Sequence, residues 1–312
     1  MTEPTPSNFD AQGAQWAWDS TSLKAFQTCP RYYKYTMVDG WTTAFKNVHL
    51  TFGGHYATAL EHYHKHRALG LDSNDALIEV VTEALLNTWE YSGSRDGVPI
   101  GKPWDGMHSA KTRDNLIRSI VWYVDEFEDE EIKTLILPDG KAAVEYSFRL
   151  PIDFGYMLCG HIDRLCEYGG AYYVMDQKTT GTTITPAFFN QFLPDTQMSL
   201  YTFAGKAIFD LPVKGVIIDA AQIAVGFTRF ERGFTFRTDS QLDEWYEDTL
   251  NDIERARQAT IDNQFPMNPT ACGNYGGCAF RSVCSRSPEI REQFLKADFI
   301  KRDVKWNPLI SR

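Results

Sequence analysis

The chain has 312 residues, of which 41 are acidic and 31 basic, so its formal charge is −10. Its 43% apolar and 14% aromatic residues exclude a disordered chain, which would have few of either. No apolar run approaches the roughly 18 to 20 residues that span a bilayer. The polar start at residues 1–10 lacks the apolar segment of a signal peptide. We therefore expect a cytoplasmic protein with reduced thiols and no membrane partner.

The first 140 residues show mainly helical patterns, in which apolar side chains recur at helical spacing between capping residues and glycines. The helices predicted here span about residues 19–40, 51–68, 73–91 and 108–131. The histidines His62, His64 and His66 lie two residues apart, so they do not share one helix face, and we expect them to be exposed to solvent.

From Lys141 onward, short β-branched and aromatic segments predict strands at about 142–150, 156–167, 171–177, 213–225 and 228–237. Helices are predicted at 186–209 and 240–263. This order favours an α/β fold with a mixed sheet and helices packed on it. We divide the chain into a tail (1–18), a helical region (19–140), an α/β core (141–265) and a cysteine loop with a basic C-terminal segment (266–312).

A predicted hairpin places two carboxylates opposite each other. A turn centred on Gly169–Gly170 pairs positions whose numbers sum to 339, which sets Asp163 opposite Asp176, with Cβ atoms ~5 Å apart. Lys178 lies two residues after Asp176 and therefore points to the same face of the strand.

Two adjacent carboxylates repel each other unless a cation lies between them, which is typical of a hard-metal site. A divalent ion held there could polarise a phosphate and activate a bound water, and an ammonium beside it could stabilise developing charge. The alternative is an exposed ion pair on a surface strand. The apolar neighbours of this hairpin favour burial and hence the metal site.

These residues resemble a known family. The pattern Gly160-x-x-Asp163-Arg164, Asp176-x-Lys178 and Gln197-x-x-x-Tyr201 is similar to the RecB-type branch of the PD-(D/E)XK nucleases, which have a restriction-endonuclease-like core. The resemblance implies that Asp163 and Asp176 bind Mg²⁺ or Mn²⁺, with the Gln177 carbonyl as a further ligand. It also implies that Lys178 is the catalytic lysine and that Gln197 and Tyr201 support the site.

The family also has an early helix motif, approximately Gly-x-x-x-His-x-x-Leu-Glu, which residues 53–61 match in part. The match makes Glu61 a candidate metal ligand. Ala57 stands where the family has its histidine, and His55, two residues earlier, is a candidate replacement.

Four cysteines form a second motif. Cys272, Cys278 and Cys284 lie in and after a glycine-rich loop, and Cys29 precedes a proline far upstream. In a reducing compartment such clusters indicate a metal rather than disulfides. The pattern resembles the iron–sulfur nucleases of the AddB and Cas-four types, which implies a 4Fe–4S cluster. Zinc is the alternative, although the C-x2-C pairs usual in zinc sites are absent. The other two cysteines, Cys159 and Cys166, are predicted to be packed thiols on opposite faces of one strand.

The function that these resemblances imply is a metal-dependent DNA exonuclease that acts on single-stranded or duplex ends in phage or bacterial recombination, replication or end processing. A recombination protein is a candidate partner, and the oligomeric state stays open. The alternatives are an endonuclease or flap nuclease on the same core, and a catalytically silent DNA-binding subunit, for which the substitution at Ala57 leaves room.

The acidic average of the chain argues against broad affinity for DNA. Residues 281–312, however, have eight Lys or Arg against four Asp or Glu, a local charge of +4. Predicted DNA contacts are Arg31, Tyr32 and Lys34, which combine basic groups with a ring that can stack on bases, together with Arg164 beside Asp163. DNA binding should then be local, metal-dependent and sensitive to salt.

Overall fold

A computed structural model describes residues 6–44, 47–96 and 98–311. The chain forms two compact units that are interleaved along the sequence. The first comprises residues up to 45, 147–161 and 238–312, and the second comprises residues 46–146 and 162–237. The four regions predicted from the sequence are each one continuous segment, whereas each unit of the structure is made of two or three segments. Among the described residues, no helix is both long and apolar enough to cross a membrane.

The second unit is an α/β structure built on a mixed sheet. Its strands follow the order β7 (Met157–Tyr168), β8 (Ala171–Thr180), β9 (Val213–Ile223) and β10 (Thr228–Phe236), while β5 (Lys133–Thr134) and β6 (Val144–Pro151) both pair with β7. The β8–β9 pair is parallel, whereas β7–β8 and β9–β10 are antiparallel. β6 and β7 each pass from one unit into the other. The predicted mixed α/β fold is confirmed.

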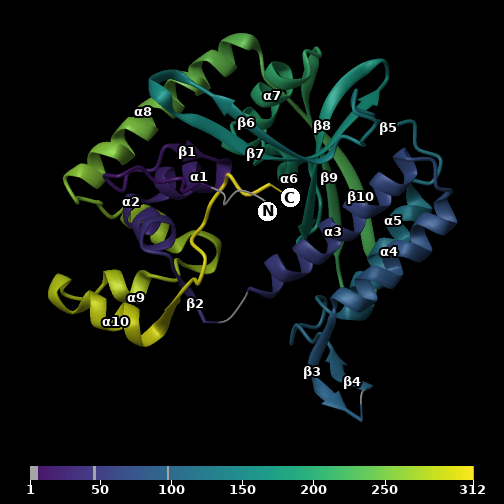
Figure 1. Cartoon of the computed structure of the whole chain (residues 1–312), viewed down its shortest axis with the longest axis horizontal. Coiled ribbons are helices and arrows are strands. Elements are labelled where there is room, and N and C mark those ends of the chain that lie inside the picture. The colour runs from purple at the N-terminus through teal and green to yellow at the C-terminus, as the bar shows by residue number, and fades with distance from the viewer. Residues whose placement is uncertain (1–5, 45–46, 97, 312) are drawn as a thin grey trace. The chain divides into compact units, whose positions relative to one another are not determined.

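Helices lie on both faces of this sheet (Figure 1). On one face are α3 (Val48–Ala68), α4 (Ser73–Asn87) and α5 (Arg113–Glu126), and on the other are α6 (Pro186–Asn190) and α7 (Thr196–Phe209). Strand alternation assigns the faces. A Cβ on Gly53 of α3 would meet the Thr179 hydroxyl at 3.2 Å, and one on Gly205 of α7 would meet Val174 at 3.4 Å. Because Thr179 and Val174 are separated by an odd number of residues, they point to opposite faces of β8.

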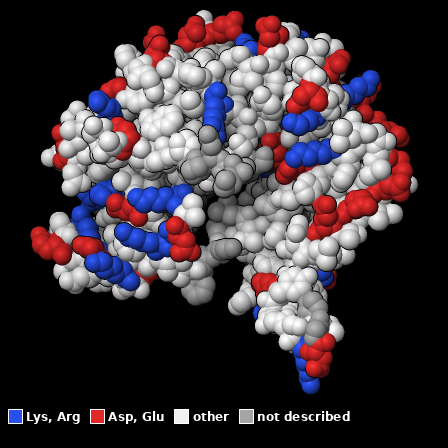
Figure 2. All heavy atoms as spheres, viewed as in Figure 1, with Lys and Arg blue, Asp and Glu red and all other residues white. Residues whose placement is uncertain are grey.

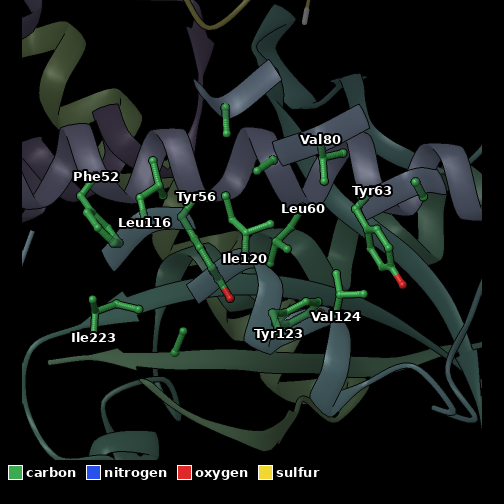
Figure 3. Packing of buried hydrophobic residues seen from close by; sticks show 14 residues of the cluster. Phe52, Tyr56, Leu60, Tyr63, Val80, Leu116, Ile120, Tyr123, Val124 and Ile223 are labelled. Carbon is green, nitrogen blue, oxygen red and sulfur yellow. The ribbon is translucent and has the colours of Figure 1, made fainter. Parts of the chain in front are cut away.

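The core of this unit lies between α3, α4, α5 and the sheet. Figure 3 shows apolar side chains of α3, among them Phe52, Tyr56 and Leu60, lying against Ile120 of α5 and Ile223 of β9. Phe52, Leu60 and Ile120 are fully buried. Along α3, Phe52, Tyr56, Leu60 and Tyr63 recur every three to four residues and form the apolar stripe that packs on the sheet.

A buried polar network runs beneath the same helices. Tyr123 of α5 donates a hydrogen bond of 2.6 Å to Asp219 of β9, and its hydroxyl lies 3.3 Å from Nε2 of His64. Arg232 of β10 binds the other oxygen of Asp219 at 3.1 Å. The expectation that His64 is exposed was wrong: only 3% of its surface is accessible. Burial, followed by the charges of Arg164 and Arg232, lowers the pKa of His64 well below its usual value, so it is a neutral hydrogen-bonding partner.

The first unit consists mostly of helices. These are α1 (Ser20–Thr28), α2 (Pro30–Tyr33), the π-helical segment η1 (Lys34–Val38), α8 (Asp239–Ile261), α9 (Arg281–Cys284) and α10 (Arg291–Asp298), with short 3₁₀ turns η2 (Asp153–Gly155), η3 (Pro269–Gly276) and η4 (Pro288–Ile290). Capping boxes begin α1 at Asp19 and α8 at Thr238. β1 (Ala17–Trp18) runs parallel to the start of β7, and β2 (Trp41–Thr43) pairs with β11 (Phe299–Lys301).

Three local features differ from the sequence predictions. The helix predicted at 19–40 is broken at Cys29, whose backbone is extended (φ −166°, ψ 115°), because Pro30 disfavours a helical conformation in the residue before it. The helix predicted at 186–209 is two helices, separated around Pro194. The end of the segment predicted as helix 73–91 instead starts a hairpin of β3 (Trp89–Arg95) and β4 (Val98–Pro103).

Replacing Leu60 by Ala should lower the free energy of unfolding by about 2–5 kcal/mol, because it opens a cavity in a packed core. Leu50 offers a matched control in the same helix, since 77% of its surface is exposed, and Leu50→Ala should change stability by less than about 0.5 kcal/mol. Urea unfolding of both variants measures the difference. Equal effects would contradict the packing described for α3.

Candidate active site

The β7–β8 hairpin has the predicted register. Gly169 and Gly170 both have positive φ angles, 56° and 73°, as a two-residue turn of this kind requires. The paired residues run from Tyr168–Ala171 to Arg164–Met175, so that each pair sums to 339. The recorded pairing ends there, and Asp163 and Asp176 are the next residues along the two strands.

The two carboxylates lie in a largely enclosed setting. Asp176 is 1% exposed, and Asp163 is partly buried. Oδ2 of Asp163 accepts a hydrogen bond of 2.9 Å from the backbone N–H of Gln177. Burial raises the pKa of Asp163 to about 8, and the negative charges of Asp176 and Glu145 contribute in the same direction while Lys178 opposes them. Without a bound cation, the pair therefore does not carry two full negative charges at neutral pH.

Lys178 lies against this pair. Its Nζ is 2.5 Å from Oδ2 of Asp176 and donates a hydrogen bond of 3.2 Å to Oε1 of Gln197. Burial alone would lower the pKa of Lys178, but the charges of Asp176 and Asp163 outweigh it and raise the pKa. The side chain is therefore an ammonium that the two acids hold in place.

The first turn of α7 positions the polar groups that face Lys178. Asp195 caps the helix by accepting hydrogen bonds from the N–H groups of Gln197 and Met198. The Gln197 amide then donates 3.0 Å to the hydroxyl of Tyr201, one turn further along. Burial, followed by the charges of Asp163 and Asp176, raises the pKa of Tyr201 well above its usual value, so the hydroxyl stays neutral. The structure thus brings together Asp163, Asp176, Lys178, Gln197 and Tyr201.

The four predicted cysteines lie around one cavity in the first unit. Cys29 lies in the break between α1 and α2, Cys272 in η3, Cys278 just after it and Cys284 at the end of α9. All four line one cavity of about 330 Å³. Burial raises the pKa of Cys278, and the charges of Cys272 and Cys29 raise it further, as expected for neighbouring sulfur atoms. The remaining cysteines, Cys159 and Cys166, are buried in β7, as predicted.

A family model for the PD-(D/E)XK nuclease superfamily matches residues 18–285 of the chain. The chain belongs to this superfamily of nucleases. The solved structure of a putative exonuclease from Eubacterium rectale is similar at 12% sequence identity, with 83% of this chain and 86% of that chain covered and a TM-score of 0.48. The protein SSO0001 is similar at 11% identity, with 76% of each chain covered and a TM-score of 0.29. No curated protein sequence matches this chain.

PD-(D/E)XK nucleases typically use divalent ions such as Mg²⁺ or Mn²⁺, and the donor set here suits such an ion. Asp163 and Asp176 offer hard carboxylate oxygens, and the strand beside them offers the Gln177 carbonyl. Among the described residues, no three His, Cys, Asp or Glu side chains are grouped so as to hold a metal ion. The proposed donor set has only two such side chains, Asp163 and Asp176, because its third donor is a backbone carbonyl. The ammonium of Lys178 lies against Asp176 and offsets part of the negative charge of the two acids.

The early helix motif of the superfamily lies on α3. Glu61 forms an ion pair of 2.5 Å with Lys65, one turn further along. His55 packs its ring against Trp104 at 5.6 Å between centroids. Glu61 and His55 remain ligand candidates predicted from the motif alone.

The predicted DNA contacts have partners inside the protein. Arg31 donates a hydrogen bond to the Phe265 carbonyl, Lys34 pairs with Asp39 at 2.9 Å, and the Tyr32 ring meets the Phe280 ring. Their role toward DNA stays a prediction.

Arg164 differs from the other three because it is 3% exposed. Its guanidinium pairs with Glu130 at 3.1 Å and donates to the Thr134 hydroxyl and the Ile132 carbonyl. Residue 164 faces away from Asp163 along β7, so its charge serves the buried network on the opposite face of the sheet.

Two acidic residues near the site were not identified from the sequence. Asp195 is one of the charges that raise the pKa of Lys178, and its position as a helix cap two residues before Gln197 was a usable signal. Glu145 raises the pKa of both Asp163 and Tyr201. Its signal is the second hairpin, between β6 and β7, whose turn is marked by Pro151 and Gly155.

Asp163→Asn should stabilise the metal-free protein at pH 7.5 by ~5 kcal/mol, because it removes a buried acid whose ionisation opposes folding. Asn keeps an oxygen that can accept from Gln177. The sign follows from the raised pKa: the wild type loses stability as the pH rises from about 4 toward 8, whereas the variant does not. The gain should therefore shrink to nothing near pH 4.

Urea unfolding in EDTA across this pH range measures the effect. A variant less stable than the wild type at pH 7.5, or a gain that does not change with pH, would contradict the electrostatics assigned to Asp163.

Proposed function

We propose that this protein is a metal-dependent deoxyribonuclease that hydrolyses phosphodiester bonds from strand ends. The observation that carries the proposal is the contact of the Lys178 ammonium with Asp176, 2.5 Å away, beside Asp163. An ammonium fixed next to a pair of acids is the arrangement required to bind a phosphate and a divalent cation together. The family of the chain supports this reading.

The catalytic residues have separate roles in the proposal. Asp163, Asp176 and the Gln177 carbonyl would hold Mg²⁺ or Mn²⁺, which supplies a Lewis acid for the phosphate and for the attacking water. Lys178 orients that water or stabilises the charge that develops on the phosphate. Gln197 fixes the ammonium through its amide oxygen, and Tyr201 fixes the amide in turn.

We infer that the cavity of the first unit holds a 4Fe–4S cluster. Four cysteines from segments far apart in the sequence line one space of about 330 Å³, which is larger than the space a single tetrahedral zinc ion needs at a Zn–S distance of about 2.3 Å. Cluster ligation by four thiolates is the usual arrangement. It would tie Cys29, at the end of α1, to the C-terminal segment that carries the other three cysteines.

DNA is the proposed substrate, and basic side chains supply the attraction to it. Figure 2 shows Lys and Arg gathered over α9 and α10 of the first unit, with acidic residues between them. A local excess of positive charge in an acidic chain gives binding that weakens with salt. The proposed setting is recombination, replication or end processing of DNA in a bacterium or phage.

The purified protein should degrade end-labelled linear DNA when Mg²⁺ or Mn²⁺ is added, and should leave covalently closed circles of the same sequence intact. Lys178→Ala should lower the rate about 100-fold or more, because it removes a charge fixed at the reacting phosphate. Lys214→Ala is the matched control, since Lys214 is an exposed lysine on β9 and its loss should leave the rate unchanged.

Three results of this assay would overturn parts of the proposal. Cleavage of circles would indicate an endonuclease. Absence of cleavage by the wild type would favour a silent DNA-binding subunit. Full activity of the Lys178 variant would remove the assigned mechanism.

Protein purified without oxygen should be brown, absorb near ~400 nm and contain about four iron atoms and four sulfides per chain. Cys278→Ala should lose the iron. Cys159→Ala should keep it, because Cys159 belongs to the same unit but is buried in β7 outside the cavity. A colourless wild type with one zinc per chain would contradict the cluster.

A further inference from the structure

We propose that Asn268 is the positioning residue of the cysteine site. Its side chain holds the segment that carries Cys29, and its backbone N–H donates a hydrogen bond to the Cys29 sulfur that raises the reduction potential of the cluster. This role rests on the proposed 4Fe–4S cluster, and it identifies the protein contacts that arrange the ligands and adjust the cluster.

Asn268 contacts two of the four cysteines. Its backbone N–H donates a hydrogen bond of 3.3 Å to Sγ of Cys29, and its backbone carbonyl accepts from Sγ of Cys272 at 3.8 Å. The side-chain amide donates 2.9 Å to the Thr28 carbonyl, and the amide oxygen accepts 2.6 Å from the Thr270 hydroxyl. Both ends of the amide are therefore bonded, which fixes its orientation between the end of α1 and the cysteine loop.

The residues just before Asn268 bind the chain on the other side of Cys29. The Arg31 N–H donates 3.2 Å to the Pro266 carbonyl, and Nε of Arg31 donates 3.1 Å to the Phe265 carbonyl. These two bonds and that of the Asn268 amide join both flanks of Cys29 to one short segment. Because none of the three includes a cysteine, they do not depend on iron. The two parts of the chain that carry the ligands should therefore stay together when iron is removed.

The other two ligands have apolar surroundings. Cys278 and Cys284 pack against a cluster that includes the buried side chains of Phe280 and Phe299, whose rings stack at 4.5 Å between centroids. Apolar packing fixes these two sulfur atoms and limits the access of water on their side. Cys29, by contrast, receives its contact from a hydrogen-bond donor of Asn268.

The N–H bond to Cys29 fits a sulfur that binds iron. A backbone N–H can donate to a thiol or to a thiolate, and the negative charge of the thiolate strengthens the bond. Hydrogen bonds to the sulfur atoms of an iron–sulfur cluster are among the features that set its reduction potential. This one stabilises the reduced cluster, which carries one more negative charge, so loosening it should lower the potential.

The test compares two asparagines that both line the cavity, in full-length protein prepared without oxygen and loaded with iron and sulfide. The rate of iron loss to an added chelator and the midpoint potential in a redox titration are measured. Asn268→Ala should lose iron at least tenfold faster, because loss of a supporting partner weakens a metal site 10- to 100-fold, and its midpoint potential should be lower. Asn274→Ala, at an exposed position of η3, should change the rate less than twofold and leave the potential unchanged.

A second variant serves as the test if Asn268→Ala does not fold. Asn268→Asp keeps the shape of the side chain and the acceptor for Thr270, but it cannot donate to the Thr28 carbonyl. It should show the same faster iron loss and lower potential.

The outcomes separate this role from the cluster itself. A wild type with four iron atoms, whose rate of iron loss and potential are unchanged in both Asn268 variants, would overturn the role of Asn268 while the cluster stands. Equal effects of Asn268→Ala and Asn274→Ala would do the same. Faster iron loss at an unchanged potential would also overturn it, because that result indicates a loss of stability alone. A wild type without iron would overturn both proposals.

Discussion

The repulsion between Asp163 and Asp176 is the constraint on which the rest of the site depends. Two acids at facing positions of a buried hairpin destabilise the fold unless positive charge lies beside them. Lys178 supplies one positive charge from within the chain, and a divalent cation would supply the remainder. Natural sequences keep such unfavourable groups where function requires them and gain stability elsewhere.

The stability comes from the opposite face of the sheet. There α3, α4 and α5 bury an apolar cluster, and Tyr123, Asp219 and Arg232 form a polar network with its hydrogen bonds made. That packing fixes β7, β8 and β9 as a rigid support, so that the side chains on the other face are held in position. A site built on strands in this way is positioned more accurately than one built on loops.

The sequence predicted the parts of the molecule that local rules determine. The two glycines at 169–170 accept positive φ angles, so the register of the hairpin, and with it the pairing of the acids, could be counted from the turn. The face on which Lys178 lies followed from strand alternation, whereas Gln197 and Tyr201 were assigned to the site from the resemblance to the nuclease family.

Other features depend on packing that no local pattern records. The burial of His64 arises from Tyr123 and Asp219, which lie 59 and 155 positions further along the chain (123 − 64 and 219 − 64). The left-handed backbone at Glu145 has no glycine to announce it. Arg164 follows Asp163 directly, and only the register shows that it points the other way. The proximity of Cys29 to the distant cysteine triplet was inferred from a resemblance, because the sequence spacing between them does not show that they lie near each other in the fold.

The central claim is that Asp163 and Asp176 hold a divalent cation in place of the contact with Lys178. Anomalous diffraction from a crystal of the protein soaked in Mn²⁺ tests this most directly. The account predicts one manganese peak about 2.1 Å from oxygens of both aspartates, with the Lys178 ammonium displaced from Oδ2 of Asp176. A crystal in which Lys178 keeps that contact and manganese binds elsewhere, or not at all, would contradict it.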